Sequence, residues 1–301
     1  MIDSPLAAVP EYPRRLVYFG TPEMAVAPLE ALVSNGYDVA LVVTGADKRR
    51  GRGTELTPSP VKAAALELDL AVTDRVEDCL TVGADLGVVV AFGKLIRRPV
   101  LEQLPMINIH FSLLPRWRGA APVERALLAG DTETGTCLMQ LETGLDTGPV
   151  YDRRTVPIRE RVTAAELRAE LVELGVRQLL ESLQGGLRNP VPQEGDELYA
   201  SKFDPSEFQI DWNRTADFID RLVRVGSAWT TVRGRRLRVH AAQPVDAVTD
   251  ARPGSVSGIQ VTCGDGRVLG LDMVQPEGKA PMDALSWSRG ARLEDGELLG
   301  H

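Results

Sequence analysis

The chain has few of the residues on which disulfide frameworks and metal sites depend. It holds three cysteines and three histidines in 301 residues. The cysteines, Cys79, Cys137 and Cys263, are scattered and form no Cys-x-x-Cys motif. A disulfide scaffold and a structural zinc site both need closer spacing. We therefore expect no disulfide and no metal cofactor.

Long apolar runs are also missing. No stretch approaches the roughly 20 apolar residues that cross a membrane, and the first residues lack the basic-then-apolar pattern of a signal peptide. We expect a cytoplasmic protein with no membrane partner.

Hydrophobic residues make up 44% of the chain and charged residues 25%. This composition predicts packed domains rather than an unstructured chain.

The net charge of −8 excludes a surface that is basic throughout. The basic residues are nevertheless grouped in two places. One group within five residues contains Lys48, Arg49, Arg50 and Arg52. A second stretch, Arg214 to Arg238, holds seven arginines against two aspartates. Because the distribution of charge matters more than its sum, an RNA partner stays possible.

Strand and helix patterns alternate in the first half of the chain. Leu16–Phe19 and Val39–Val43 read as buried strands on either side of a helix, the opening of a right-handed parallel unit. Asp85–Phe92 is apolar almost throughout, as in strands covered on both faces. No Gly-x-Gly-x-x-Gly follows the first strand, so a dinucleotide cofactor is not supported. The pattern predicts an α/β fold, Rossmann-like, with a mostly parallel sheet.

The pattern changes after about residue 205. Short apolar runs alternate with glycine turns, which predicts a small C-terminal β-barrel of the OB-like type; the runs are Ala228–Val232, Arg236–Ala241, Gly258–Cys263 and Val268–Val274. We divide the chain into a disordered lead-in (1–13), a catalytic domain (14–192), a linker (193–205) and the barrel domain (206–301).

The richest chemistry lies in the run MINIHFSLLPRWRGAAP, residues 106–122. Met106–His110 reads as a strand, on which Asn108 and His110 point to the same face. An asparagine can donate a hydrogen bond to a developing oxyanion, and a histidine can move a proton near neutral pH. Asp146, in a later loop, could orient the imidazole. These residue types predict an acyl-transfer site.

Two other interpretations of these residues were weighed. A histidine on a strand is usually structural, although the adjoining Asn108 and the Pro/Trp/Gly loop favour function here. Ser112, His110 and Asp146 could form a nucleophilic triad. The chain has no Gly-x-Ser-x-Gly elbow around Ser112, so a serine hydrolase is disfavoured.

Several ordered motifs together carry a family resemblance. They are Asn108-x-His110, Ser112-Leu113-Leu114-Pro115, Gly119, Pro122 and Gly144-Leu145-Asp146-Thr147-Gly148. This series resembles the folate-dependent formyltransferases, and in particular those that act on initiator methionyl-tRNA. The resemblance extends from Leu16 to about Leu293. It implies a formyl donor, 10-formyltetrahydrofolate, and release of tetrahydrofolate without a metal.

The resemblance also implies roles for single residues. Asn108, His110 and Asp146 would be catalytic. The folate pocket would include Ala91, Phe92, Gly93, Ser112, Leu113, Leu114 and Pro115. We further hypothesise a cis peptide bond between Leu114 and Pro115, and we expect the protein to act as a monomer.

Several segments of the sequence bear on the identity of the acceptor. The resemblance implies that the loop Ala46–Thr57 contacts the acceptor end of tRNA through Arg49, Arg50 and Arg52, and that the barrel domain also binds tRNA. The runs Pro58–Lys62 and Pro276–Met282 favour a tRNA acceptor. The alternatives are a sugar-nucleotide N-formyltransferase, a formyltetrahydrofolate hydrolase, and a non-catalytic RNA-binding module.

Overall fold

The computed structural model describes residues 5–49 and 56–300, and the chain divides into two compact units. The N-terminal unit comprises Met1–Val123, Glu133–Pro157 and Leu167–Ser201. The C-terminal unit comprises Glu124–Thr132, Ile158–Glu166 and Lys202–His301. The linker that we expected at 193–205 is therefore split, because its residues up to Ser201 belong to the N-terminal unit.

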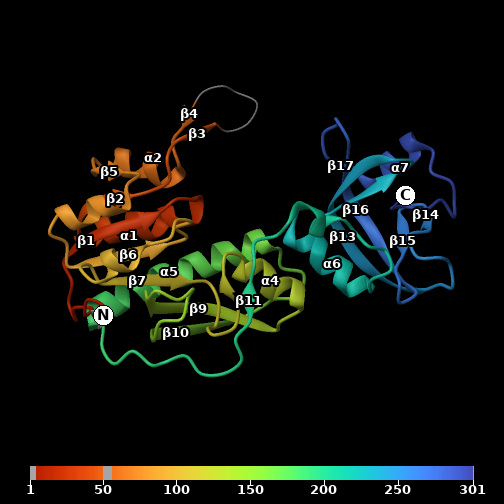
Figure 1. Cartoon of the computed structure of the whole chain (residues 1–301). Helices are drawn as coiled ribbons and strands as arrows, with labels where there is room; N and C mark the ends of the chain where they lie inside the picture. The colour runs from red at the N-terminus through yellow and green to blue at the C-terminus, as the bar shows by residue number, and fades with distance from the viewer. Residues whose placement is uncertain (1–4, 50–55, 301) are drawn as a thin grey trace. The chain divides into compact units, whose positions relative to one another are not determined.

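A seven-stranded sheet, in the order β10-β9-β7-β6-β1-β2-β5, forms the centre of the N-terminal unit (Figure 1). Its strands are β1 (Arg15–Gly20), β2 (Asp38–Val43), β5 (Val72–Thr73), β6 (Leu86–Val90), β7 (Met106–His110), β9 (Glu133–Gln140) and β10 (Val150–Pro157). The five strands from β7 to β5 run parallel, and β9 pairs antiparallel with both of its neighbours, β7 and β10. The predicted mostly parallel, Rossmann-like sheet is confirmed.

Helices cover both faces of this sheet, which explains why the inner strands β1, β2 and β6 are largely apolar. On one face Val17 and Phe19 pack with Cys79 and Val100. On the other face a Cβ at Gly175 would lie 2.9 Å from Ile109, so α5 packs closely there. The helical segments up to residue 201 are η1 (Glu23–Ala25), α1 (Val26–Ser34), α2 (Pro60–Glu67), η2 (Val76–Thr81), α3 (Arg98–Leu101), α4 (Pro122–Ala129) and α5 (Ala164–Gly185), and most of α4 belongs to the C-terminal unit.

Local sequence sets the starts of two of these helices. The Ser59 hydroxyl accepts a hydrogen bond from the Lys62 backbone N–H at 3.0 Å, with Pro60 as the first helical residue of α2. At α5, Thr163 and Glu166 form a reciprocal capping box, with bonds of 3.2 and 2.8 Å.

The described part of the expected lead-in, residues 5–13, lies against the N-terminal unit. The Ala7 backbone N–H donates to the Leu101 carbonyl at 3.0 Å, and Leu6 packs against the core. The Glu11 carbonyl accepts from the Leu187 N–H at 2.9 Å. Backbone hydrogen bonds and one half-buried leucine therefore attach the segment.

The expected loop Ala46–Thr57 also differs from the prediction. Its ends pair as a short antiparallel hairpin, β3 (Lys48–Arg49) with β4 (Leu56–Thr57). Arg49 is exposed on this hairpin. Arg50 and Arg52 lie outside the described residues.

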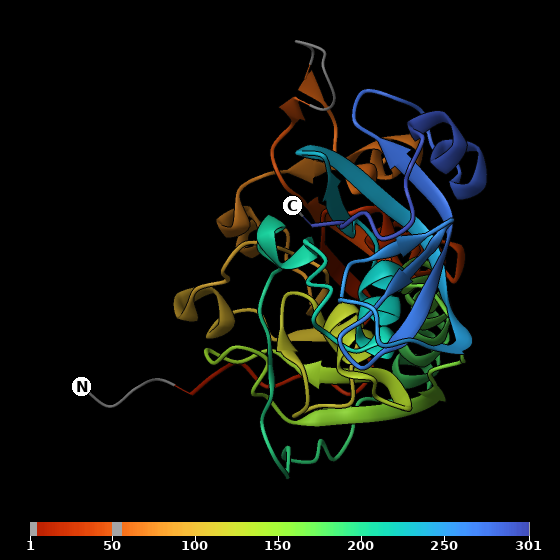
Figure 2. The same cartoon turned by 90° about the vertical axis from the view of Figure 1, so that its right-hand side faces the viewer.

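The C-terminal unit is a curled antiparallel sheet, a half-barrel, in the order β12-β13-β16-β15-β14 with β17 paired to β16 (Figures 1 and 2). Its strands are β12 (Trp229–Val232), β13 (Arg235–Val248), β14 (Val256–Ser257), β15 (Gln260–Thr262), β16 (Arg267–Pro276) and β17 (Met282–Asp283). Its helical segments after residue 202 are η3 (Pro205–Phe208), α6 (Ala216–Val225) and α7 (Ala284–Ala291). Apolar residues of α6, α7 and the strands share one core. The predicted C-terminal barrel is thus confirmed as a half-barrel.

Within the described ranges, no helix is both long and apolar enough to cross a membrane.

The carboxylate of Asp85 holds the first residues of β1. It accepts hydrogen bonds from the backbone N–H groups of Arg14 and Arg15 at 3.0 and 2.8 Å, and these bonds lower the pKa of Asp85 below its usual value. A lowered folded-state pKa adds stability above the unfolded pKa, roughly 3.9, and this stability is lost as the pH falls below that value. Because Asp85 is exposed, we expect Asp85→Asn to lower the free energy of unfolding by no more than about 1 kcal/mol at pH 7. The difference from wild type should shrink towards pH 3. Urea unfolding at both pH values measures it, and an equal difference at both would contradict the assignment.

Candidate active site

Strand β7 brings Asn108 and His110 to one face, as the alternation of a strand requires. The strand has the predicted bounds, Met106–His110, and lies between β6 and β9. Asn108 is 8% exposed and His110 is 5% exposed. Two nearly buried polar side chains therefore lie at the carboxyl end of a central strand, the edge where open α/β sheets bind ligands.

The loop after β7 turns back to the histidine. The Nε2 atom of His110 lies 2.9 Å from the carbonyl oxygen of Trp117. A carbonyl can only accept, so Nε2 carries a proton and donates it to this bond. The Ser112 hydroxyl donates to the Arg116 carbonyl at 2.7 Å, and the peptide bond Leu114–Pro115 is cis, as hypothesised.

Asp146 lies on the other side of the imidazole. Its Oδ2 atom is 3.7 Å from Nδ1 of His110 and accepts a hydrogen bond from the backbone N–H of Gly119 at 2.8 Å. The separation from Nδ1 is within ion-pair range and longer than a hydrogen bond. Catalytic contacts often shorten only when substrate binds. The structure thus brings together the three residues for which we expected catalytic roles.

The carboxamide of Asn108 has no hydrogen-bond partner among the residues that the structure describes. A nearly buried amide without a partner is unfavourable in a folded protein. An oxygen of a bound substrate would supply the missing acceptor. The amide is therefore a free donor next to His110, as an oxyanion-stabilising group should be.

The loop between β9 and β10 carries Asp146 and depends on a close backbone approach. A Cβ at Gly148 would lie 2.0 Å from the carbonyl oxygen of Gln140, closer than any side chain tolerates. The Gln140 N–H donates to the Pro149 carbonyl at 2.9 Å. Only glycine at position 148 lets the loop fold back on β9, and this places Asp146 near His110.

The seven residues expected in the folate pocket separate into two groups. Ala91, Phe92, Gly93 and Leu113 are exposed or half-buried. Ser112, Leu114 and Pro115 are buried, and Leu114 packs with Cys137, Met139 and Val150. The first group can contact a ligand directly. The second group packs in the protein interior and thereby fixes the loop that follows β7.

A polar cavity of about 380 Å³ opens at the same sheet edge, beyond the ends of β2 and β5. It is lined by Thr44, Gly45, Ala46, Asp47, Lys62, Val72, Thr73 and Asp74. Lys62 Nζ forms bonds of 2.9 and 2.8 Å with the two carboxylate oxygens of Asp47. This part of the edge thus has room for a polar ligand.

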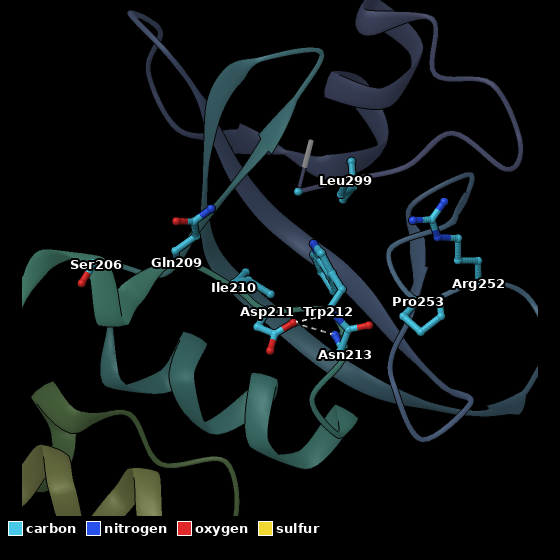
Figure 3. Close-up of a pocket in the computed structure, with 10 residues that line it drawn as sticks. Ser206, Gln209, Ile210, Asp211, Trp212, Asn213, Arg252, Pro253 and Leu299 are labelled. Carbon is cyan, nitrogen blue, oxygen red and sulfur yellow. Dashed lines mark hydrogen bonds between the residues drawn. The ribbon is translucent and has the colours of Figure 1, made fainter.

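A second cavity, of about 400 Å³, lies in the C-terminal unit and is shown in Figure 3. The Asp211 carboxylate there accepts bonds from the backbone and side chain of Asn213 at 3.0 and 2.8 Å, and the Trp212 indole donates to Thr230. The described residues that line the cavity include no histidine or cysteine. Among residues 5–49 and 56–300, no cluster of His, Cys, Asp and Glu is arranged to hold a metal ion.

Sequence reasoning missed two residues near this site, Arg118 and Gln193. Arg118 is only 4% exposed. Gln193 is half-buried and bonds to the loop that carries Asp146. Local sequence does not distinguish Arg118 from the exposed Arg116 two residues earlier, and only the fold shows that Arg118 is buried with a partner.

Known protein families match both parts of the chain. The formyl transferase family model matches residues 14–183, and the model of the formyl transferase C-terminal domain matches residues 202–292. The methionyl-tRNA formyltransferase of Jannaschia sp. is 40% identical over 301 residues, covering 95% of this chain and 99% of its own length. That of Methylococcus capsulatus is 41% identical over 308 residues, covering 95% and 99%.

Solved structures share the fold at lower identity. An N-formyltransferase from Helicobacter canadensis, in complex with folinic acid and dTDP-3-aminofucose, superposes with a TM-score of 0.67 at 15% identity, over 86% of this chain and 98% of its own. HypX from Aquifex aeolicus, in complex with tetrahydrofolic acid, gives 0.65 at 19% identity, over 92% and 47%. With family models matched in both parts and relatives about 40% identical over nearly the whole length, the chain belongs to the formyl transferase family, among the relatives of the methionyl-tRNA formyltransferases.

Proposed function

We propose that the protein is a methionyl-tRNA formyltransferase, which transfers the formyl group of 10-formyltetrahydrofolate to the α-amine of initiator methionyl-tRNA. The observation that carries the proposal is identity of about 40% to curated enzymes of that name over 95% of the chain. The cluster of Asn108, His110 and Asp146 supports it with a suitable chemistry.

The reaction is an exchange of amines on a formyl carbon. The α-amine attacks that carbon, a new C–N bond forms, and the carbonyl oxygen becomes an oxyanion. The Asn108 amide donates a hydrogen bond to the oxyanion. The amine loses a proton, N10 of the folate gains one, and the bond from carbon to N10 breaks.

His110 is the group that moves the proton between the two nitrogens. Its Nε2 is engaged with the Trp117 carbonyl, so Nδ1 is the nitrogen left to exchange a proton. Asp146 lies beside Nδ1 and orients the ring. The products are formylmethionyl-tRNA and tetrahydrofolate, with no change in oxidation state.

For the folate donor we propose contacts from Ala91, Phe92, Gly93 and Leu113. Phe92 packs edge-to-face on Phe19, with ring centroids 5.5 Å apart, which fixes the wall beside β6. Flat aromatic rings such as a pterin suit a pocket with apolar walls and a few polar groups. Ser112, Leu114 and Pro115 support this pocket by holding its loop.

For the tRNA acceptor we propose contacts from Arg49, Arg50, Arg52 and one exposed face of β13. On this strand Arg236 and Arg238 face solvent and alternate with the buried Leu237 and Val239. Neither arginine has an ion pair within the described residues. The Arg236 guanidinium lies 4.2 Å from the centre of the Trp229 ring. A strand of unpaired arginines beside an aromatic ring suits a nucleic-acid backbone.

Two other arginines of the basic stretch are paired with carboxylates. Arg224 pairs with Asp220 at 2.9 Å, and Arg233 pairs with Glu297 at 2.7 Å. Arg236 and Arg238, by contrast, keep their positive charge available on the exposed face of β13. This explains how a chain of net charge −8 can present a basic surface.

The test is formyl transfer from 10-formyltetrahydrofolate to charged initiator methionyl-tRNA, with a dTDP-amino sugar as the competing acceptor and formate release measured in parallel. We expect transfer to tRNA. Formylation of the sugar, or release of formate with tRNA untouched, would show that the acceptor is wrong.

The double variant Arg236→Ala/Arg238→Ala tests the proposed tRNA surface. We expect a KM for tRNA that is roughly tenfold higher, an unchanged kcat, and a salt dependence of binding weakened by about two phosphate contacts. Arg75→Ala, which removes an exposed arginine from the N-terminal unit, is the matched control. Equal effects of the two changes would contradict the surface.

A further inference from the structure

The side chain of Gln193 holds the backbone of the loop that presents Asp146. Its Nε2 donates to the carbonyl oxygens of Asp146 and Gly148, both at 2.8 Å. The amide therefore binds the backbone on both sides of Thr147. Asp146 has φ of +52°, a conformation that a non-glycine residue keeps only where its surroundings hold it.

A buried guanidinium fixes the orientation of Gln193. Arg118 donates from Nε and Nη2 to Oε1 of Gln193 at 3.1 and 2.7 Å, and its Nη1 pairs with Glu197 at 2.6 Å. A guanidinium has no acceptor, so Oε1 must face it. The Nε2 donors are thereby aimed at the two carbonyls of the Asp146 loop.

The same segment also supports the backbone group that binds the Asp146 carboxylate. Gly119, whose N–H donates to Asp146, lies in β8 (Arg118–Gly119), which pairs with β11 (Tyr199–Ala200). The Ala200 carbonyl accepts from Ala120 and Ala121 at 2.9 and 3.1 Å. Gln193 therefore fixes Asp146 at its main chain, and the β8–β11 pair supports the group that binds its carboxylate.

We propose that Gln193 is a positioning residue of the active site, which acts on His110 through Asp146 and does not touch substrate. The inference rests on the proposed formyl transfer and deepens it. The Oδ2 atom of Asp146 is already 3.7 Å from Nδ1 of His110. A small shift of the loop therefore ends their contact, and a misplacement of about 1 Å at such a site can reduce the rate about 10²-fold.

The test is a double-mutant cycle of Gln193→Leu and Asp146→Asn, read as single-turnover formyl transfer. Alone, Gln193→Leu should lower kcat by about 10²-fold and leave KM for folate and tRNA within about twofold. In the Asp146→Asn background it should have less than a threefold further effect, because residues that act as one unit are not additive.

Gln193→Glu distinguishes positioning of the Asp146 loop from simple attachment of the Gln193 segment to Arg118. A glutamate keeps its acceptor for Arg118, so the segment stays attached, but it cannot donate to the carbonyls of Asp146 and Gly148. We expect it to be as slow as Gln193→Leu while its melting temperature stays near wild type. Glu194→Leu, on the neighbouring exposed residue, is the control with unchanged kcat.

Two results separate the possible failures. Equal slowing by Gln193→Leu in the wild-type and Asp146→Asn backgrounds, or full activity of Gln193→Glu, would overturn the positioning role alone. Absence of formyl transfer by the wild-type chain would overturn the proposed function and the positioning role with it.

Discussion

Replacement of His110 by alanine is expected to lower kcat of formyl transfer by about 10³-fold, with KM for folate and tRNA changed by less than about threefold. His110 is the titratable side chain that lies beside both the Asn108 amide and the Asp146 carboxylate. Without it, the proton of the attacking amine has no positioned carrier to the leaving nitrogen. Single-turnover transfer at saturating donor and acceptor measures the loss of the chemical step.

The matched control is His240→Ala. His240 lies on β13 and bonds to Gln275 at 3.0 Å, in the C-terminal unit. Its removal should leave kcat unchanged at saturating tRNA. Added imidazole should restore part of the activity of His110→Ala, because it can carry the missing proton. A His110→Ala variant with wild-type kcat would contradict the catalytic role.

Strongly patterned elements were predictable from the sequence. The strand Met106–His110 has the predicted bounds, because a short apolar run is a clear local signal. Helix α7, Ala284–Ala291, was not predicted. Its sequence contains two serines and a glycine, and its stability comes from packing of Trp287 into the C-terminal core.

Strand β13 shows the same limit of local reasoning. The sequence predicted a strand at Arg236–Ala241, whereas the strand runs from Arg235 to Val248 and includes Pro244. A proline inside a strand normally argues against it. Here irregular register against β16 after Val239 and after Val245 accommodates the extra length. Such irregularities depend on the partner strand, so the local sequence cannot show them.

Some features of the candidate site could likewise be predicted from the sequence, and others depend on tertiary contacts. Strand alternation was enough to pair Asn108 with His110. The approach of Asp146 depends on Gly148 and on the path of its loop. The contact of Arg118 with Gln193 joins residues 75 positions apart, and no periodicity encodes a contact between two loops. The N-cap Ser59 and the capping box at Thr163 were readable, because their partners lie within three residues.

Replacement of Asn108 by alanine is expected to lower kcat by about 10²–10³-fold, the usual effect of removing one oxyanion donor. The same substitution should change the free energy of unfolding only slightly. The Asn108 carboxamide has no hydrogen-bond partner in the described part of the chain, so its loss breaks no internal bond. Kinetics and urea unfolding of the same preparation measure both quantities.

Asn108→Asp distinguishes donation from shape. An aspartate fills nearly the same volume, but an ionised carboxylate has no proton to donate and repels a developing oxyanion. We therefore expect it to be at least as slow as Asn108→Ala. Wild-type turnover of the aspartate variant would mean that the oxyanion is stabilised elsewhere. A loss of activity in Asn108→Ala without a loss of unfolding free energy would show that this nearly buried amide is kept for the transition state, because the fold alone gains nothing from it.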